Sequence, residues 1–114
     1  MEGYIKISRA ILNHPALNKR DRTYCETGAF LWILLYASFA ERDFSIGTQT
    51  VRLKRGELCY SVSYMANAWG WSQSRTRHYL DKLRKFDVIL FVKPYGKSAD
   101  FPNIIKVQNY DIYQ

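Results

Sequence analysis

The longest run of apolar positions lies in the first third of the chain and predicts a helix. Almost every residue over 30–39 is apolar, which is typical of a helix that packs on several faces. Thr23 and Glu26 have the spacing of a capping box, in which a hydroxyl and a carboxylate each satisfy a backbone N–H at a helix start. We therefore predict a core helix over 24–40, preceded by an N-terminal extension over 1–22.

The middle of the chain combines a strand pattern with two helical segments. Residues 49–54 predict a strand, Arg55-Gly56 a turn, and 58–60 a short returning strand. Two helical segments follow close together, over 64–69 and 73–85. Their short separation predicts a pair of helices that cross through a tight turn.

The last third of the chain has the pattern of an antiparallel β-hairpin. Residues 88–92 form an unbroken β-branched and aromatic run, which is typical of a buried strand, and 104–108 form a second strand. The segment between them, 94–100, is rich in turn-forming residues. We predict a hairpin over 88–108 whose loop forms a wing.

The residues between the two helical segments match the chemistry of a helix-turn-helix. Ala66 supplies a small side chain at the helix crossing, Gly70 can adopt positive φ, and Ser72 suits the N-cap of the second helix. The segment over 64–86 resembles the general helix-turn-helix pattern, with Thr76 at a position that usually holds Val or Ile. The Thr76 methyl can pack in the core, but its hydroxyl needs a hydrogen-bond partner.

The predicted elements follow the order helix, short strand, helix, helix, strand, loop, strand. A winged helix-turn-helix has this order, and few other small folds do. We therefore predict an α+β fold, namely a winged helix-turn-helix with a helical core and a C-terminal β-hairpin wing, formed by one domain over 1–114. The 114 residues suit one domain, and the 47% hydrophobic content argues against disorder.

Positive charge is concentrated in the second helix and the predicted wing. The formal net charge is +7, and residues 72–97 hold seven basic and two acidic side chains. This excess suggests nucleic acid or an anionic membrane surface as partner, although a charge run can also be only a solvated helix face. Together with the turn chemistry it favours double-stranded DNA, and no apolar stretch has the length of a membrane span.

The second helix has a polar face whose first residues suit base contacts. Apolar positions recur at spacings of three and four along the opposite face, which we expect to point toward the core. The N-terminal residues of a recognition helix reach base edges in the major groove. We expect such contacts from Gln73, Ser74, Arg77 and His78, while Arg75 suits either a base or a phosphate.

Residues further along the chain suit the DNA backbone. Lys82, Arg84 and Lys85 follow on the same helix and are expected to contact phosphates. The loop between the wing strands offers further cations, although a plain hairpin loop with solubilising lysines is an equal alternative. The candidate DNA-binding residues are Ser72, Gln73, Ser74, Arg75, Arg77, His78, Lys82, Arg84, Lys85, Lys93, Tyr95 and Lys97.

Cysteine, histidine and motif content argue against catalysis. Cys25 and Cys59 belong to no CxxC pair, so we expect reduced thiols and a cytoplasmic location. The N-terminus has no signal-peptide pattern. The cysteines and histidines lack metal-ligand spacing, and no phosphate loop or activated nucleophile is visible. We expect no metal, no cofactor and no enzymatic activity.

Motifs spread over nearly the whole chain carry a resemblance to one family. They are GYIKI at 3–7, IL at 11–12, KRGEL at 54–58, WGWS at 69–72 with Arg75, and NYDIYQ at 109–114. On these motifs the chain resembles the N-terminal winged-helix domain of phage and prophage replication proteins, the replisome-organiser and DnaD-like group. The resemblance implies binding of double-stranded origin DNA, with a separate C-terminal region that recruits helicase machinery.

The chain departs from that family in two places. It ends at Gln114 without a recruitment region, so a piece of a longer protein and a naturally small protein both stay open. Asp87 stands just before the first wing strand, where the family often has Gly. Asp tolerates the left-handed conformation better than most residues, so we still expect the helix to stop there.

Other functions fit the same predicted fold. A prophage-type transcriptional regulator needs the same DNA contacts as a replication protein, and a winged helix can also serve as a protein-interaction module. The aromatic residues that suit a protein surface are Tyr64, Tyr95, Tyr110 and Tyr113. The tryptophans Trp32, Trp69 and Trp71 could stack on single-stranded bases, but their positions favour the core. The DNA target and the choice between monomer, homodimer and array on DNA stay open.

Overall fold

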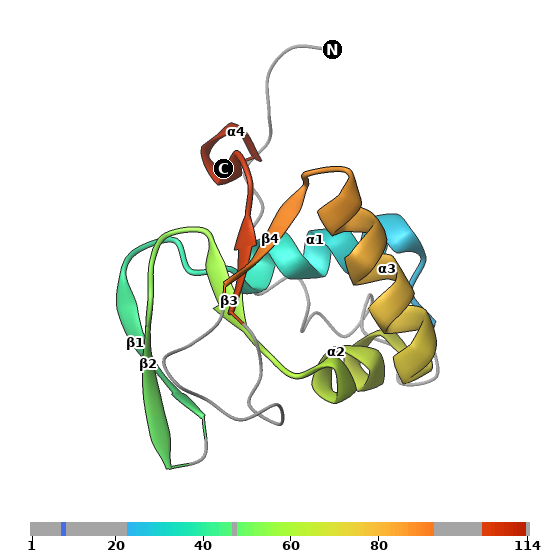
Figure 1. Ribbon diagram of the computed structural model, residues 1–114, viewed down its shortest axis with the longest axis horizontal. Helices are drawn as coiled ribbons and strands as arrows, with labels where there is room; N and C mark the ends of the chain where they lie inside the picture. The colour runs from blue at the N-terminus through green and yellow to red at the C-terminus, as the bar shows by residue number, and fades with distance from the viewer. Residues whose placement is uncertain (1–7, 9–22, 47, 93–103, 114) are drawn as a thin grey trace.

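Helices and strands are interspersed along the computed structural model, which describes residues 8, 23–46, 48–92 and 104–113 (Figure 1). This part of the chain has a mixed α+β fold with four helices and two small antiparallel sheets. The predicted N-terminal extension lies outside the described residues except for Ser8, and so does the loop of the predicted wing.

The core helix begins later than predicted. α1 runs over Glu26–Tyr36, and its N-cap is Cys25, whose Sγ accepts a hydrogen bond from the Gly28 N–H at 3.3 Å. The predicted capping box at Thr23 is therefore wrong, because the extended cap conformation falls two residues later, on a cysteine. Thr23 is exposed and precedes the helix.

The end of α1 is determined by a distant part of the chain. Ala37 is already extended, with ψ of 144°. The Ser38 N–H then donates to the Glu57 carbonyl at 2.9 Å, and the Ser38 carbonyl accepts from the Gly56 N–H at 2.7 Å. These bonds align the chain with a strand, so the helix ends at Tyr36 and does not reach residue 40.

A three-stranded antiparallel sheet joins the middle of the chain to its end. β3 (Glu57–Cys59) and β4 (Ile89–Val92) flank the central β5 (Ile104–Val107). The predicted antiparallel pairing of the last two strands is therefore confirmed. The prediction that 88–92 is a buried strand is wrong, because β4 lies at the edge of the sheet and only Ile89 in it is buried. The predicted turn at Arg55-Gly56 is also present, but the strand after it pairs with β5 instead of returning along β2 (Gln49–Leu53).

A second sheet is a two-stranded ribbon that the hydrophobic pattern did not reveal. β1 (Arg42–Ile46) pairs antiparallel with β2. β1 was missed because only Phe44 and Ile46 in it are apolar. The ribbon lies across the molecule from α2 (Val62–Trp69) and α3 (Gln73–Lys85) (Figure 1). Phe44 attaches it by packing against buried side chains of β2, β3 and β5.

The pair α2 and α3 agrees closely with its prediction. α3 begins at Gln73 and ends at Lys85 as predicted, while α2 begins two residues earlier than predicted, at Val62. Gly70 between them is left-handed at φ 71°, and its N–H bonds to the last turn of α2. The Trp71 N–H donates to the Ala66 carbonyl at 2.9 Å, which closes the turn.

Two residues other than glycine have positive φ in the described ranges, and both mark the end of an element. Asp87, at φ 60°, follows α3 and leads into β4, so the predicted left-handed position is confirmed. Asn109, at φ 56°, follows β5 and precedes the short helix α4 (Tyr110–Tyr113). A small polar side chain thus replaces glycine at each place.

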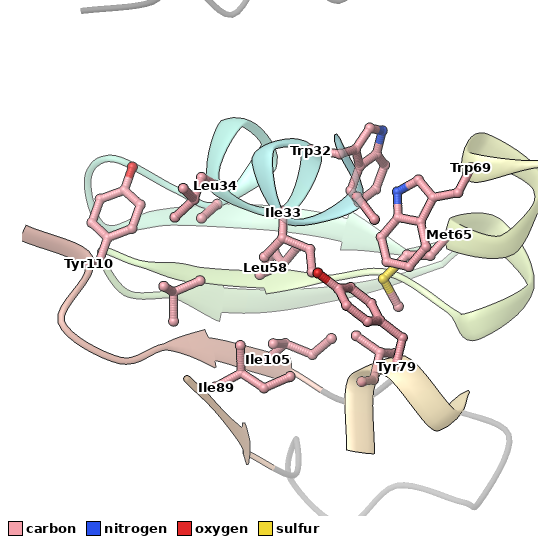
Figure 2. Packing of buried hydrophobic residues seen from close by; sticks show 14 of the residues in the cluster. Trp32, Ile33, Leu34, Leu58, Met65, Trp69, Tyr79, Ile89, Ile105 and Tyr110 are labelled. Carbon is pink, nitrogen blue, oxygen red and sulfur yellow. The ribbon is translucent and has the colours of Figure 1, made fainter. Parts of the chain in front are cut away.

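The hydrophobic core lies between the three longer helices and the sheet of β3, β4 and β5 (Figure 2). Trp69 is fully buried, and its ring meets those of Trp32, Trp71 and Tyr79 edge-on. α1 buries side chains on most sides, as its apolar composition predicts. The three tryptophans are all buried, so the prediction that they serve the core is confirmed.

The two cysteines differ in environment, and alkylation should separate them. Cys25 is exposed, whereas burial raises the pKa of the Cys59 thiol to about 11. Since the thiolate is the nucleophile, we expect iodoacetamide at pH 8 to label Cys25 in the folded protein and to leave Cys59 unmodified. Mass spectrometry of tryptic peptides would measure this, with urea-unfolded protein as the control that labels both. Equal labelling of the two in the folded state would contradict the structure.

Candidate nucleic-acid interface

α3 begins with a cap built from its own sequence. The Ser72 Oγ accepts from the Arg75 N–H at 3.1 Å, as predicted for the N-cap. Thr76 is fully buried, and its hydroxyl donates to the Ser72 carbonyl at 2.9 Å. The hydroxyl that the sequence left without a partner is therefore satisfied inside the helix.

One side of α3 is fastened to the core. Thr76, Tyr79 and Leu80 are buried, in agreement with the predicted apolar stripe. The Tyr79 hydroxyl donates to the backbone carbonyl of Glu26 at 2.7 Å, which ties α3 to the first residue of α1. Burial raises the pKa of Tyr79 to about 12, so this phenol stays protonated and remains a donor at neutral pH.

The other side of α3 presents polar side chains to solvent. Gln73, Ser74, Arg77 and His78 are exposed, as expected for the four candidate base-reading residues. Arg77 is the only one of the six arginines in the described ranges without a hydrogen bond, ion pair or ring contact there. His78 likewise has no side-chain partner within those ranges. Both side chains can therefore meet a ligand without breaking an internal contact.

The cations in the second half of α3 are paired with carboxylates. Lys82 Nζ lies 3.3 Å from Glu26 Oε2, and Lys85 Nζ lies 3.4 Å from Asp81 Oδ2. Arg84 also bonds to Asp81, and this guanidinium is the main cause that lowers the pKa of the Asp81 carboxyl. The structure thus divides the candidate residues: unpaired polar groups near the start of α3, and partly neutralised cations near its end.

Arg75 differs from both groups because it lies on an aromatic ring. Its guanidinium carbon is 3.9 Å from the centroid of the Trp71 ring, a cation–π contact. Trp71 is itself held by a hydrogen bond from its Nε1 to the Tyr24 carbonyl at 2.8 Å. The sequence placed Trp71 only in the core, although its spacing of four residues from Arg75 was a signal for the contact.

A hollow of about 380 Å³ lies beside Arg75, between α3 and the start of α1. It is lined by Glu26, Trp71, Ser72, Ser74, Arg75, His78, Tyr79 and Lys82. Five of these are candidate DNA-binding residues, so the structure brings them together around one concave surface. Glu26 was assigned only to a capping role from the sequence, and nothing local could reveal its contact with Lys82, which is 56 positions away.

The residues of the predicted wing contacts, Lys93, Tyr95 and Lys97, lie outside the described residues. The strand that leads into the loop does lie against the candidate helix, since the Arg84 guanidinium carbon is 5.5 Å from the centroid of the Phe91 ring. β4 and the C-terminal half of α3 are therefore neighbours.

Comparison of the chain with protein-family models, curated proteins and solved structures found no match. Among the described residues, no group of three or more His, Cys, Asp or Glu side chains is arranged to hold a metal ion. None of the helices in those ranges has the length and apolar content needed to cross a bilayer.

Proposed function

We propose that this chain is a winged helix-turn-helix domain that binds double-stranded DNA. The α2–α3 pair with its left-handed Gly70, followed by the antiparallel strands β4 and β5, supports this fold. The observation that carries the function is the state of Arg77 and His78, which are exposed and unpartnered within the described ranges, across the helix from a buried stripe. An exposed guanidinium and an exposed imidazole without internal partners in those ranges suit an anionic ligand.

The position of these residues along α3 favours the major groove. That groove admits one α-helix, and residues near the helix N-terminus reach the base edges. Ser74 and His78 are one turn apart on the outermost line of α3, with Arg77 beside them. Arg can pair with guanine O6 and N7, which gives Arg77 the leading role in specificity.

The proposed setting is initiation of DNA replication of phage or plasmid type, which follows from the family resemblance. Replication proteins would then be partners through a region outside this sequence. A prophage-type transcriptional regulator is the alternative, and it would use the same helix. Selection of bound fragments from a random duplex pool would supply the preferred sequence: a palindrome indicates a homodimer, and direct repeats indicate an array.

The substitution Arg77→Ala tests the proposed function. We expect it to weaken binding of the selected duplex by about 1–3 kcal/mol and to relax the preference at one base pair. Fluorescence anisotropy against a labelled duplex would measure the affinity. Lys54→Ala is the matched control, since it removes an exposed charge outside the interface. Equal losses in the two variants would remove Arg77 from the interface.

Salt dependence tests the DNA contact as a whole. About six phosphate contacts should give a slope near −5 in a plot of the logarithm of affinity against the logarithm of salt concentration. A flat response would contradict DNA binding by this surface.

Exposed apolar residues on α4 favour a second candidate function, protein interaction. Ile112 is 72% exposed, and Tyr113 beside it is also exposed, while Tyr64 is exposed on α2. Tyr110, which the sequence grouped with them, is buried and cannot serve such a surface. Light scattering with and without duplex would separate the two candidates, because self-association without DNA indicates a protein surface.

A further inference from the structure

We propose that the hollow between α3 and the start of α1 binds one phosphate of the DNA backbone, and that Arg75 is its main ligand. This inference rests on the proposed function and adds a role that the sequence left open, since Arg75 suited either a base or a phosphate. It also gives Glu26 a role, as an acidic side chain that competes with the bound phosphate.

The guanidinium of Arg75 is held in place before any ligand arrives. It lies over the Trp71 ring, and Trp71 is buried, hydrogen-bonded to the Tyr24 carbonyl and in edge contact with Trp69 and Tyr79. No hydrogen bond within the described ranges uses the N–H groups of the Arg75 side chain. A planar group with unused donors on a rigid support suits the two oxygens of a phosphodiester, and little flexibility is lost on binding.

The location of Arg75 on the helix favours a phosphate over a base. Ser74 and His78 mark the outermost line of α3, which would face the floor of the groove. Arg75 lies to one side of that line, on the flank that faces Glu26 across the hollow. Arg77 lies on the opposite side of that line and has no internal contact among the described residues, whereas the Trp71 ring holds Arg75 on its flank, where a helix in the major groove faces a sugar-phosphate strand.

The hollow contains further donors for an anion. Ser74, His78 and Lys82 line it together with Arg75, so hydroxyl, imidazole and ammonium groups converge on the same space. None of these side chains is buried in the core. A phosphate there would receive charge-assisted hydrogen bonds from side chains on successive turns of α3.

Glu26 is the acidic exception in the hollow. Its carboxylate pairs with Lys82 at 3.3 Å, and both side chains are about half exposed to solvent. Exposed pairs of this kind contribute little stability, so Lys82 can exchange the carboxylate for a phosphate at small cost. The remaining negative charge of Glu26 then opposes the DNA, which makes it a regulator of affinity.

Four variants of the full chain test the inference by duplex affinity measured across a salt series. Arg75→Gln should weaken binding about tenfold or more, and it should lower the salt slope by about one. Arg75→Lys should keep the slope, because it keeps the charge. Glu26→Gln should strengthen binding about threefold, because a like charge near the phosphate is removed. Lys54→Gln is the control, since it removes an exposed positive charge outside the hollow and outside the candidate DNA-binding residues.

The sequence preference of Arg75→Gln distinguishes a phosphate ligand from a base reader. We expect the loss to be equal across duplex sequences and the selected consensus to be unchanged. A changed consensus would overturn the inference, and so would an affinity loss no greater than that of Lys54→Gln. Thermal unfolding of each variant checks that the fold is kept.

Single neutral methylphosphonates along the duplex provide the second measurement. One position should weaken binding of the unmodified chain, and the same position should have no further effect on Arg75→Gln. Additive losses at every position would overturn the inference while leaving the proposed function intact. A chain that binds no duplex at all would overturn both, so the two failures are distinguishable.

Discussion

Replacing Trp69 by alanine is expected to lower the free energy of unfolding by about 3–5 kcal/mol. Trp69 is fully buried at the point where three helices meet, and its ring contacts those of Trp32, Trp71 and Tyr79 at centroid distances of 5.7, 5.0 and 6.1 Å. Alanine would leave a large cavity that these rings cannot fill without moving. Because Trp71 also supports Arg75, the DNA binding proposed above should weaken together with stability.

Urea denaturation followed by circular dichroism would measure the effect. Phe86→Ala is the matched control, because Phe86 is 73% exposed and its loss should change stability by less than about 0.5 kcal/mol. Trp69→Phe adds a second comparison. The Trp69 Nε1 has no hydrogen-bond partner among the described residues, so Phe removes a buried donor along with part of the ring. A loss in Trp69→Ala as small as that of Phe86→Ala would contradict the packing described.

The substitution Gly56→Ala is expected to destabilise the protein by about 2 kcal/mol, the second largest effect. Gly56 has φ of 85°, which an L side chain rarely adopts. A Cβ at this position would also lie 3.0 Å from the Cβ of Tyr110 and 3.2 Å from its Cγ. The backbone strain and the close contact both destabilise the folded state, because a shift of the Tyr110 side chain would remove the contact but leave the unfavourable φ unchanged.

Gly28→Ala is the control, and it should act in the opposite direction. Gly28 lies in the first turn of α1, where an added Cβ meets other atoms only at 3.5 Å or more. Alanine there should stabilise the protein by about 0.5 kcal/mol, since it lowers the entropy lost on helix formation. Thermal unfolding of both variants would measure the difference in sign. Destabilisation of equal size in the two would show that Gly56 has no special conformation.

The segment from α2 to α3 could be predicted almost to the residue because its signals are local. Gly70 ends one helix and Ser72 caps the next, and each acts through bonds to residues within four or five positions. The buried stripe of α3 likewise follows from helical periodicity alone. The exposure of Arg77 and His78 could be predicted for the same reason.

Elements that depend on distant partners could not be predicted from the pattern. α1 ends where Ser38 bonds to Glu57, and β3 pairs with β5 instead of the strand before it. In the candidate interface, the ion pair between Glu26 and Lys82 joins residues on different helices. Such contacts depend on the tertiary arrangement, and the spacing of residues along the chain does not predict them.

The bond from the Tyr79 hydroxyl to α1 ends on the backbone carbonyl of Glu26 and not on its side chain. The hydrogen bond that links the two helices and the side-chain charge of Glu26 are consequently independent. Every amino acid has this carbonyl, so a substitution at the position can keep the link between the two helices, whereas only an acidic side chain repels a polyanion. Under the proposed function, the affinity for DNA can therefore be changed at this single position without loss of the hydrogen bond that links α3 to α1.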